Sequence, residues 1–310
     1  IRIDADDTNV WLGYPPGLDN SSWTVAKVSA STGGSLVHAY VSNTAETDTL
    51  GAKFIACDGS GGAYVVLEGQ NQTNPTLDVN GTPTNFGAPP NSGGAPDFAV
   101  PDALFFTSSG TFTGSFITVN GGSTIGAEGA QPMAVVVLSG TVYLAHAEII
   151  VHDTGGDTGS ISKFVSNART TTGGGDVGQI LNSLTDFDFI GAGSTLYLCE
   201  GDAVIGSFCN LAAVNAGSLA TIWSTQTSHG ARRLAFSATT LYVVSGAGTV
   251  EQWSVGGSPV TCREQFFNNV RANYQDLAAI SGAIFVGGNE ADCHDEELAD
   301  CPSTTSCTNP

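Results

Sequence analysis

Positive charge is scarce in this chain of 310 residues. Lysine and arginine together number nine, against 29 aspartates and glutamates, so the formal net charge is −20 and the pI is near 4.2. The only lysines are Lys27, Lys53 and Lys163. An acidic surface repels phosphate backbones, and the composition therefore excludes nucleic acid as an expected partner.

Long hydrophobic runs are also missing. The longest run, MAVVVL at 133–138, has the length of a strand, whereas a membrane-spanning helix needs about 20 apolar residues. The sequence therefore predicts no membrane span. The opening IRIDADD lacks the basic and apolar regions of a signal peptide, so we expect it to be a mature or trimmed N-terminus.

Familiar catalytic signatures are absent. The chain has no G-x-S-x-G elbow and no glycine-rich phosphate loop with its lysine. CDGSGG at 57–62 holds the residues of a serine-protease GDSGG segment in the wrong order, and Ser60 is expected to be a turn residue. Enzymatic activity stays open on these grounds, but the sequence favours a protein that is not an enzyme.

Glycine, serine and threonine dominate instead, and one pattern repeats along the chain. An apolar strand, a turn of small residues and a second strand with an aromatic recur about 46 residues apart on average. The aromatics are Trp11, Tyr64, Phe105, Tyr143, Tyr197, Tyr242 and Phe285. A third segment often follows, as in GSISKFVSN, AVIGSFCNL and GTVEQWSVGG, with room for a fourth strand. Four strands in 40–50 residues are typical of a β-propeller blade.

These copies resemble the β-propeller repeats of secreted and cell-surface proteins, loosely of the NHL kind. The resemblance implies an all-β fold, a single β-propeller over residues 1–290, with the aromatic of each second strand packed against the neighbouring blade. Seven blades are favoured and six remain open, with a pair of β-sandwiches as the structural alternative. Residues 291–310 are expected to form a short, disulfide-stapled C-terminal tail.

The seventh copy, DLAAISGAIFVGG, supplies only two strands before the tail begins. Its blade could be short and capped by the tail, or the ring could have six blades. A third alternative is that a neighbouring subunit donates the missing strands.

Cysteines and sequons favour an exported protein, so we expect an extracellular or cell-surface location. The cysteines expected in disulfides are Cys199, Cys209, Cys262, Cys293, Cys301 and Cys307, with Cys57 left as a thiol. Cys199 and Cys209 could pair across a hairpin, and Cys262 could pair with a tail cysteine; a zinc site with His294 is the alternative for the tail. Glycosylation sequons occur at Asn20, Asn71 and Asn80.

Three groups of residues are candidates for binding. Asp4, Asp6 and Asp7 begin like a calcium loop but lack its glycine and its twelfth carboxylate, so only a looser calcium site is open, and no other cofactor is expected. The second group lies in the long repeat around HAEIIVHDTGGDTGS and comprises His146, Glu148, His152, Asp153 and Asp157. These five could bind a cation or substrate, although AEIIVHD also fits a plain strand. Arg232 and Arg233 could anchor an anionic sugar or offset local negative charge.

The sequence thus favours an extracellular structural or binding β-propeller, a surface or filament-type assembly subunit. Self-association or an extracellular protein or glycan is the expected partner. The alternative is a glycan-active enzyme or lectin-like binder that uses the propeller mouth.

Overall fold

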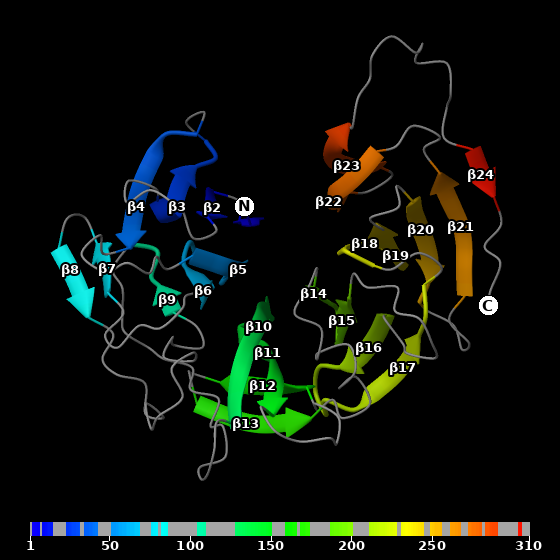
Figure 1. Ribbon diagram of the computed structural model, residues 1–310, viewed down its shortest axis with the longest axis horizontal. Helices are drawn as coiled ribbons and strands as arrows, with labels where there is room; N and C mark the ends of the chain where they lie inside the picture. The colour runs from blue at the N-terminus through cyan, green and yellow to red at the C-terminus, as the bar shows by residue number, and fades with distance from the viewer. Residues whose placement is uncertain are drawn as a thin grey trace. The chain divides into compact units, whose positions relative to one another are not determined.

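The computed structural model describes an all-β protein (Figure 1). It describes residues 2–6, 8–14, 23–31, 34–42, 51–68, 76–79, 82–85, 104–109, 128–150, 159–165, 168–173, 187–200, 211–227, 231–244, 249–255, 261–267, 272–280, 283–290 and 303–305. Within these ranges there is no helix, and hence none long and apolar enough to cross a membrane. The chain divides into two compact units, unit 1 at residues 1–173 and unit 2 at residues 174–310.

The described residues of unit 1 form three antiparallel sheets. The first has the order β1-β2-β3-β4-β7-β8, the second β5-β6-β9 and the third β10-β11-β12-β13. Their strands are β1 (Arg2–Ala5), β2 (Asn9–Gly13), β3 (Trp23–Ser29), β4 (Leu36–Ser42), β5 (Gly51–Cys57), β6 (Ala63–Glu68), β7 (Thr76–Val79), β8 (Thr82–Asn85), β9 (Leu104–Phe106), β10 (Glu128–Leu138), β11 (Thr141–Ile150), β12 (Gly159–Val165) and β13 (Ala168–Gly173).

Unit 2 also holds three sheets, with the orders β14-β15-β16-β17, β18-β19-β20-β21-β24 and β22-β23. Their strands are β14 (Asp188–Ala192), β15 (Thr195–Cys199), β16 (Leu211–Asn215), β17 (Thr221–Thr225), β18 (Arg233–Ser237), β19 (Thr240–Val244), β20 (Thr249–Ser254), β21 (Thr261–Phe267), β22 (Ala272–Ile280), β23 (Ala283–Glu290) and β24 (Ser303–Thr305). Four sequence-adjacent strands that pair in order, the predicted blade unit, occur at β1–β4, β10–β13, β14–β17 and β18–β21.

Six of the predicted first hairpins are present in the described ranges: β1–β2, β5–β6, β10–β11, β14–β15, β18–β19 and β22–β23. The third predicted copy is wrong in its pairing. Phe105 lies on β9, which pairs with β6 so that Phe105 stands opposite Tyr64, with ring centroids 4.6 Å apart. The β9 strand therefore extends the β5–β6 hairpin as a third strand. In the β14–β15 sheet the third strand is Leu211–Asn215, and the segment predicted for it around Phe208 lies outside the described residues.

Each of the four-stranded units carries the same irregularity. One extra residue bulges from the fourth strand where it pairs with the third. The bulged residues are Val37 in β4, Thr170 in β13, Ile222 in β17 and Arg263 in β21. A bulge at one fixed place shows that the copies share their three-dimensional structure as well as their sequence pattern.

Several of the repeat aromatics pack between successive sheets as predicted, but the prediction is wrong for Phe285 of β23, which is 57% exposed. Trp11 of β2 is fully buried and lies 5.9 Å from Phe106 of β9, measured between ring centroids. Tyr197 of β15 stacks on Phe236 of β18 at 5.5 Å. Tyr242 packs against the β22–β23 hairpin, and Trp253 is buried in a cluster shared by the two sheets β14–β17 and β18–β21. Burial of these rings between sheets adds apolar area to the core.

The C-terminal tail contributes one described strand, β24, which pairs with the outer strand β21. The described residues form no disulfide, and the thiol of Cys57 is free, as predicted. Cys209, Cys293, Cys301 and Cys307 lie outside the described residues. The predicted disulfides and the alternative zinc site with His294 therefore stay predictions.

Candidate functional site

Unit 1 contains a cavity of about 710 Å³ where three hairpin turns meet. The turns join β1 to β2, β5 to β6 and β10 to β11. Three aspartates, Asp4, Asp6 and Asp58, line the cavity together with Cys57 and Ser139. Each turn is built from residues with short polar side chains or none, which leaves the space between them open and acidic.

The β1–β2 turn fixes the Asp6 carboxylate. Its Oδ1 accepts hydrogen bonds from the backbone N–H groups of Thr8 and Asn9, both at 2.8 Å, and from the Thr8 hydroxyl at 2.9 Å. Burial alone would raise the pKa of Asp6, but these hydrogen bonds together lower it, so the group is charged at neutral pH. The other oxygen, Oδ2, is buried and has no hydrogen-bond partner among the described residues.

The β5–β6 turn wraps around Asp58. The Asp58 Oδ1 accepts hydrogen bonds from the backbone N–H groups of Ser60 at 2.7 Å and Gly62 at 2.8 Å, and the Asp58 N–H donates to the Gly62 carbonyl. Gly61 has a φ of +89°, and a Cβ at Gly62 would stand 2.6 Å from the Phe106 carbonyl oxygen. The glycines of CDGSGG are therefore required by this turn, and Ser60 is a turn residue as predicted.

Lys27 binds the β5–β6 turn through a hydrogen bond from its side chain. Its side chain is 3% exposed, and its Nζ donates to the carbonyl oxygens of Gly61 at 2.7 Å and Ser108 at 2.8 Å. The Nζ also lies 5.3 Å from the centre of the Trp11 ring. Burial lowers the pKa of Lys27, while the charges of Asp6 and Asp58 oppose that shift. Lys27 thus connects the β5–β6 turn to the buried Trp11 ring.

Asp4 and Cys57 meet at the base of the cavity. The Asp4 Oδ2 accepts a hydrogen bond from the backbone N–H of Cys57 at 2.7 Å. Burial raises the pKa of Asp4 above its ordinary value. Burial, followed by the charges of Asp4 and Asp6, raises the pKa of the Cys57 thiol well above its usual range. The thiol is therefore protonated at neutral pH and unsuited to act as a nucleophile.

Asp4→Asn is expected to change how stability depends on pH. A carboxyl whose folded-state pKa lies above its unfolded value binds its proton more tightly when folded, so its contribution is present at low pH and is lost as pH rises through the folded pKa. The free energy of unfolding of the wild type minus that of the variant should fall in urea titrations as the pH rises through and above the ordinary aspartate pKa.

Asp6→Asn is the matched control for this experiment, because hydrogen bonds lower the pKa of Asp6. Its contribution is present above the unfolded pKa and is lost as pH falls, so the same difference should rise with pH. A difference that rises with pH for Asp4→Asn would contradict the burial assigned to that carboxyl.

The arrangement suits recognition of a cation or a donor-rich group. It presents carboxylate oxygens and the hydroxyls of Thr8, Ser60 and Ser139, and the described residues of its lining include neither histidine nor lysine. Among the described residues no group of three or more His, Cys, Asp or Glu is placed to hold a metal ion. Asp4 and Asp6 lie together as the sequence predicts, Asp7 is outside the described residues, and calcium binding stays a prediction.

The second predicted group lies mostly outside the described residues, which exclude His152, Asp153 and Asp157. His146 and Glu148 stand on β11, opposite Pro132 and Ala130 of β10. The strand interpretation of AEIIVHD is thus confirmed as far as Ile150, where β11 ends. The three sequons at Asn20, Asn71 and Asn80 also lie outside the described ranges.

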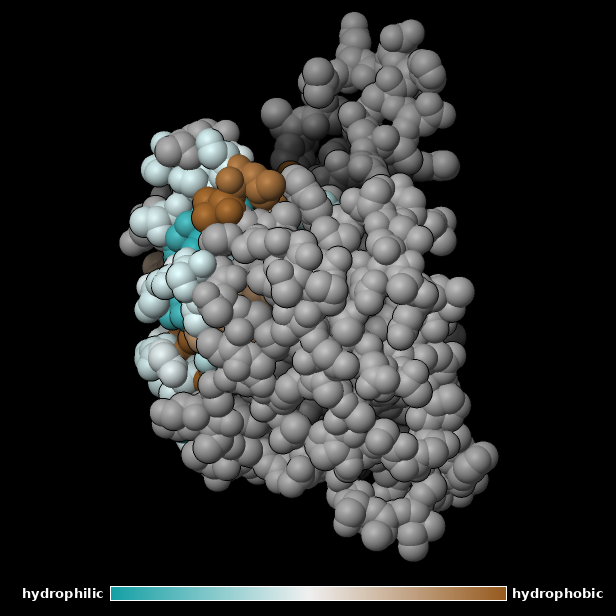
Figure 2. Space-filling view, turned by 90° about the vertical axis from the view of Figure 1, so that its left-hand side faces the viewer, coloured by the Kyte–Doolittle hydropathy of each residue, from teal (hydrophilic) through white to brown (hydrophobic). Residues whose placement is uncertain are grey.

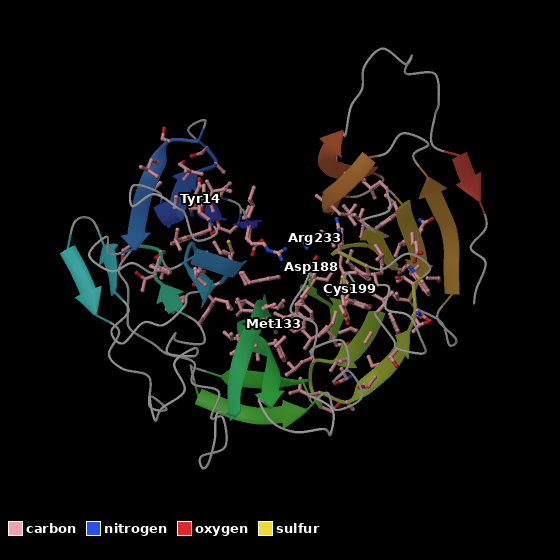
Figure 3. The ribbon with its side chains drawn as sticks, viewed as in Figure 1. Tyr14, Met133, Asp188, Cys199 and Arg233 are labelled. Carbon is pink, nitrogen blue, oxygen red and sulfur yellow. The ribbon has the colours of Figure 1, made fainter. Side chains whose placement is uncertain are left out.

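The arginine pair lies at the start of β18 in unit 2. The Arg233 Nη1 donates to the Arg232 carbonyl at 2.6 Å, and both side chains are half-buried. Beside them Asp188 of β14, 7% exposed, accepts a hydrogen bond from the Leu234 N–H at 2.7 Å (Figure 3). Asp4 makes the same contact to Cys57 in unit 1, so in both units a carboxylate on one first strand binds the backbone of the next first strand.

Three residues of these sites were missed by sequence reasoning: Lys27, Asp58 and Asp188. Their signals are present in the sequence. Lys27 is the single lysine in the apolar strand WTVAKVS, Asp58 stands in the turn CDGSGG, and Asp188 begins the apolar strand DFIGA. Each is a polar group that needs a partner when it is buried. The partner could not be named, because it comes from a different copy of the repeat.

No family model matches this chain, and no curated protein matches it. Solved structures do resemble it. "YCF48 bound to D1 peptide" is 13% identical with a TM-score of 0.43, covering 92% of this chain and 88% of that one. The WD40 β-propeller domain of Doa1 is 11% identical with a TM-score of 0.38, covering 93% and 88%. AztD of Citrobacter koseri is 10% identical with a TM-score of 0.37, covering 96% and 69%.

Proposed function

We propose that the chain is an exported β-propeller that acts as a binding module and not as an enzyme. The observation that carries the proposal is the open cavity of unit 1, whose carboxylates are fixed by turn hydrogen bonds. The repeated four-stranded units support a propeller of six or seven blades. Export is supported by the three sequons and the seven cysteines.

The ligand class that fits this cavity is a basic segment of a partner protein. Asp6 and Asp58 stand on two turns that line the same cavity, and their carboxylates can accept hydrogen bonds from a lysine or arginine head group. The net charge of −20 attracts such a segment over longer range and speeds its association.

A titration with a lysine heptapeptide tests this function, with a glycine-serine peptide as the neutral reference. The double variant Asp6→Asn with Asp58→Asn should weaken binding of the lysine peptide by about tenfold or more. The control Glu68→Gln with Asp78→Asn removes the same charge from strands β6 and β7 and should change affinity by about twofold at most. Equal losses in the two double variants would show non-specific attraction and contradict the proposal.

A second candidate function, subunit of an extracellular assembly, is favoured by one observation. Strand β17 ends its sheet with an outer edge that no other described strand covers, and its sequence carries no charge. The other alternative, a glycan-active enzyme or lectin-like binder near 146–157, rests on residues that lie mainly outside the described ranges.

A further inference from the structure

Strand β17, with the sequence TIWST, differs from the other strands that end a sheet. The free edge of a sheet is a template for pairing, and proteins protect it with charge, proline, short length or a covering strand. In the described part of the chain β8 contains Pro83, β13 contains Arg169, and β9 and β24 are three residues long. β17 has none of these features.

The bulge in β17 does not prevent a further strand from pairing. The equivalent strands β4 and β21 carry the same bulge, and each nevertheless pairs with another antiparallel strand. In β21 the paired residues begin two positions after the bulged Arg263 and run from Gln265 to Phe267. The corresponding residues are Ser224 and Thr225 of β17 and the next residue, Gln226, which follow the bulged Ile222.

The exposed side chains of β17 point to a covering partner. Ile222 is 52% exposed, whereas the neighbouring Trp223 is half-buried with its ring 6.2 Å from Tyr197. One side of the strand is therefore anchored in the core and the other presents an apolar side chain and a serine to solvent. Because β17 is already extended and fixed by its pairing with β16, adding another strand to its edge costs less conformational entropy.

The charge distribution identifies the partner as a second copy of the same chain. At a net charge of −20 two copies repel one another over most of their surface. No Asp, Glu, Lys or Arg occurs between Asp202 and Arg232, and β17 lies in the middle of this uncharged segment. Two copies can approach there with the least repulsion.

We propose that two copies of this chain associate by antiparallel pairing of their β17 strands through residues Ser224–Gln226. The pairing is two-fold symmetric, so it closes on a dimer. This dimer proposal rests on the proposed assembly role and assigns the β17 edge as the surface through which copies associate. A longer assembly would need a second surface.

Sedimentation equilibrium of the full chain over a range of concentrations tests the proposal, with the variant Ser224→Lys. Ser224 is exposed, so the variant should keep the wild-type circular dichroism and thermal midpoint. Lysine lowers the net negative charge and would strengthen non-specific association. In the two-fold pairing, however, Ser224 lies opposite Gln226 of the second copy, so the two introduced lysines become diagonal neighbours on one face of the joined sheet and repel each other. The dimer dissociation constant should rise about tenfold or more.

Leu36→Lys is the matched control. It adds the same charge at a residue that is 48% exposed on β4, a bulged strand already paired with β7. The dissociation constant of the Leu36→Lys dimer should stay within about twofold of the wild type. Figure 2 shows a small patch of hydrophobic residues among hydrophilic ones on one side of the molecule. Amide hydrogen exchange should slow at residues 224–226 as the wild-type concentration rises.

The possible results distinguish failure of the β17 interface from failure of the assembly role. A wild type that stays monomeric at every concentration contradicts both the assembly role and the β17 interface. A dimer that Ser224→Lys leaves intact contradicts the interface alone. Protection of residues 224–226 in a monomeric sample would show that a different strand covers this edge, and would overturn the assignment to a second copy.

Discussion

Trp253→Ala is expected to lower the free energy of unfolding by about 3–5 kcal/mol. Trp253 is 3% exposed and belongs to the cluster shared by the β14–β17 and β18–β21 sheets. Its Nε1 donates to the Oε2 of Glu251 at 2.9 Å, and Glu251 is 1% exposed. The substitution therefore opens a cavity between two sheets and takes a hydrogen-bond donor from a buried side chain.

Trp253→Phe separates the two contributions, because it keeps an aromatic ring and removes the donor. Its cost should be about 1–3 kcal/mol, the range for leaving a buried polar group without one partner. Urea denaturation followed by circular dichroism measures both variants. A loss below about 1 kcal/mol for Trp253→Ala would contradict the placement of this ring between sheets.

Lys27→Met is expected to cost about 3 kcal/mol and to alter the cavity of unit 1. Methionine fills the space of the lysine stem but leaves the carbonyl oxygens of Gly61 and Ser108 without the donor that binds them in the wild type. The same change removes the positive charge that faces Asp6 and Asp58. We therefore expect the β5–β6 turn to loosen, which faster amide exchange at residues 58–62 would report.

Lys163→Met is the control for this prediction. Lys163 is half-buried on β12 and lies 6.0 Å from the centre of the Tyr143 ring, so its loss should cost about 1 kcal/mol or less. Equal costs for the two substitutions would show that Lys27 has no special role in holding the turn.

The sequence predicts the strands of this fold better than their pairing. An aromatic on the second strand and a turn of small residues correctly locate six first hairpins, because both follow from local strand and turn chemistry. Phe105 carries the same pattern, yet its strand pairs with β6. A period-2 apolar pattern says that a segment is a strand, but it does not say which edge the strand joins.

The candidate site shows the same limit. Asp6 and the CDGSGG segment could each be recognised in the sequence as turn chemistry, and the structure confirms those turns, whereas Asp4 lies on strand β1. That the turns from three different hairpins meet at one cavity depends on contacts between residues more than 50 positions apart, such as Asp4 with Cys57. No local pattern reports such a contact.

The bulge of the fourth strand was not foreseen for a related reason. Val37, Thr170, Ile222 and Arg263 share no side-chain chemistry, and their common property is a position in the strand pairing. The pairing of β24 with β21 likewise joins the tail to a strand that ends 36 residues before it begins. Both features became visible only once the register was known.

Amide hydrogen exchange at the β5–β6 turn, followed by mass spectrometry, tests the central claim most directly. Residues 57–61 of this turn line the cavity. A saturating lysine heptapeptide should slow exchange at residues 58–62 several-fold, while the glycine-serine peptide leaves the rate unchanged. An unchanged rate in the presence of bound lysine peptide would place the binding surface elsewhere and contradict the role proposed for this cavity.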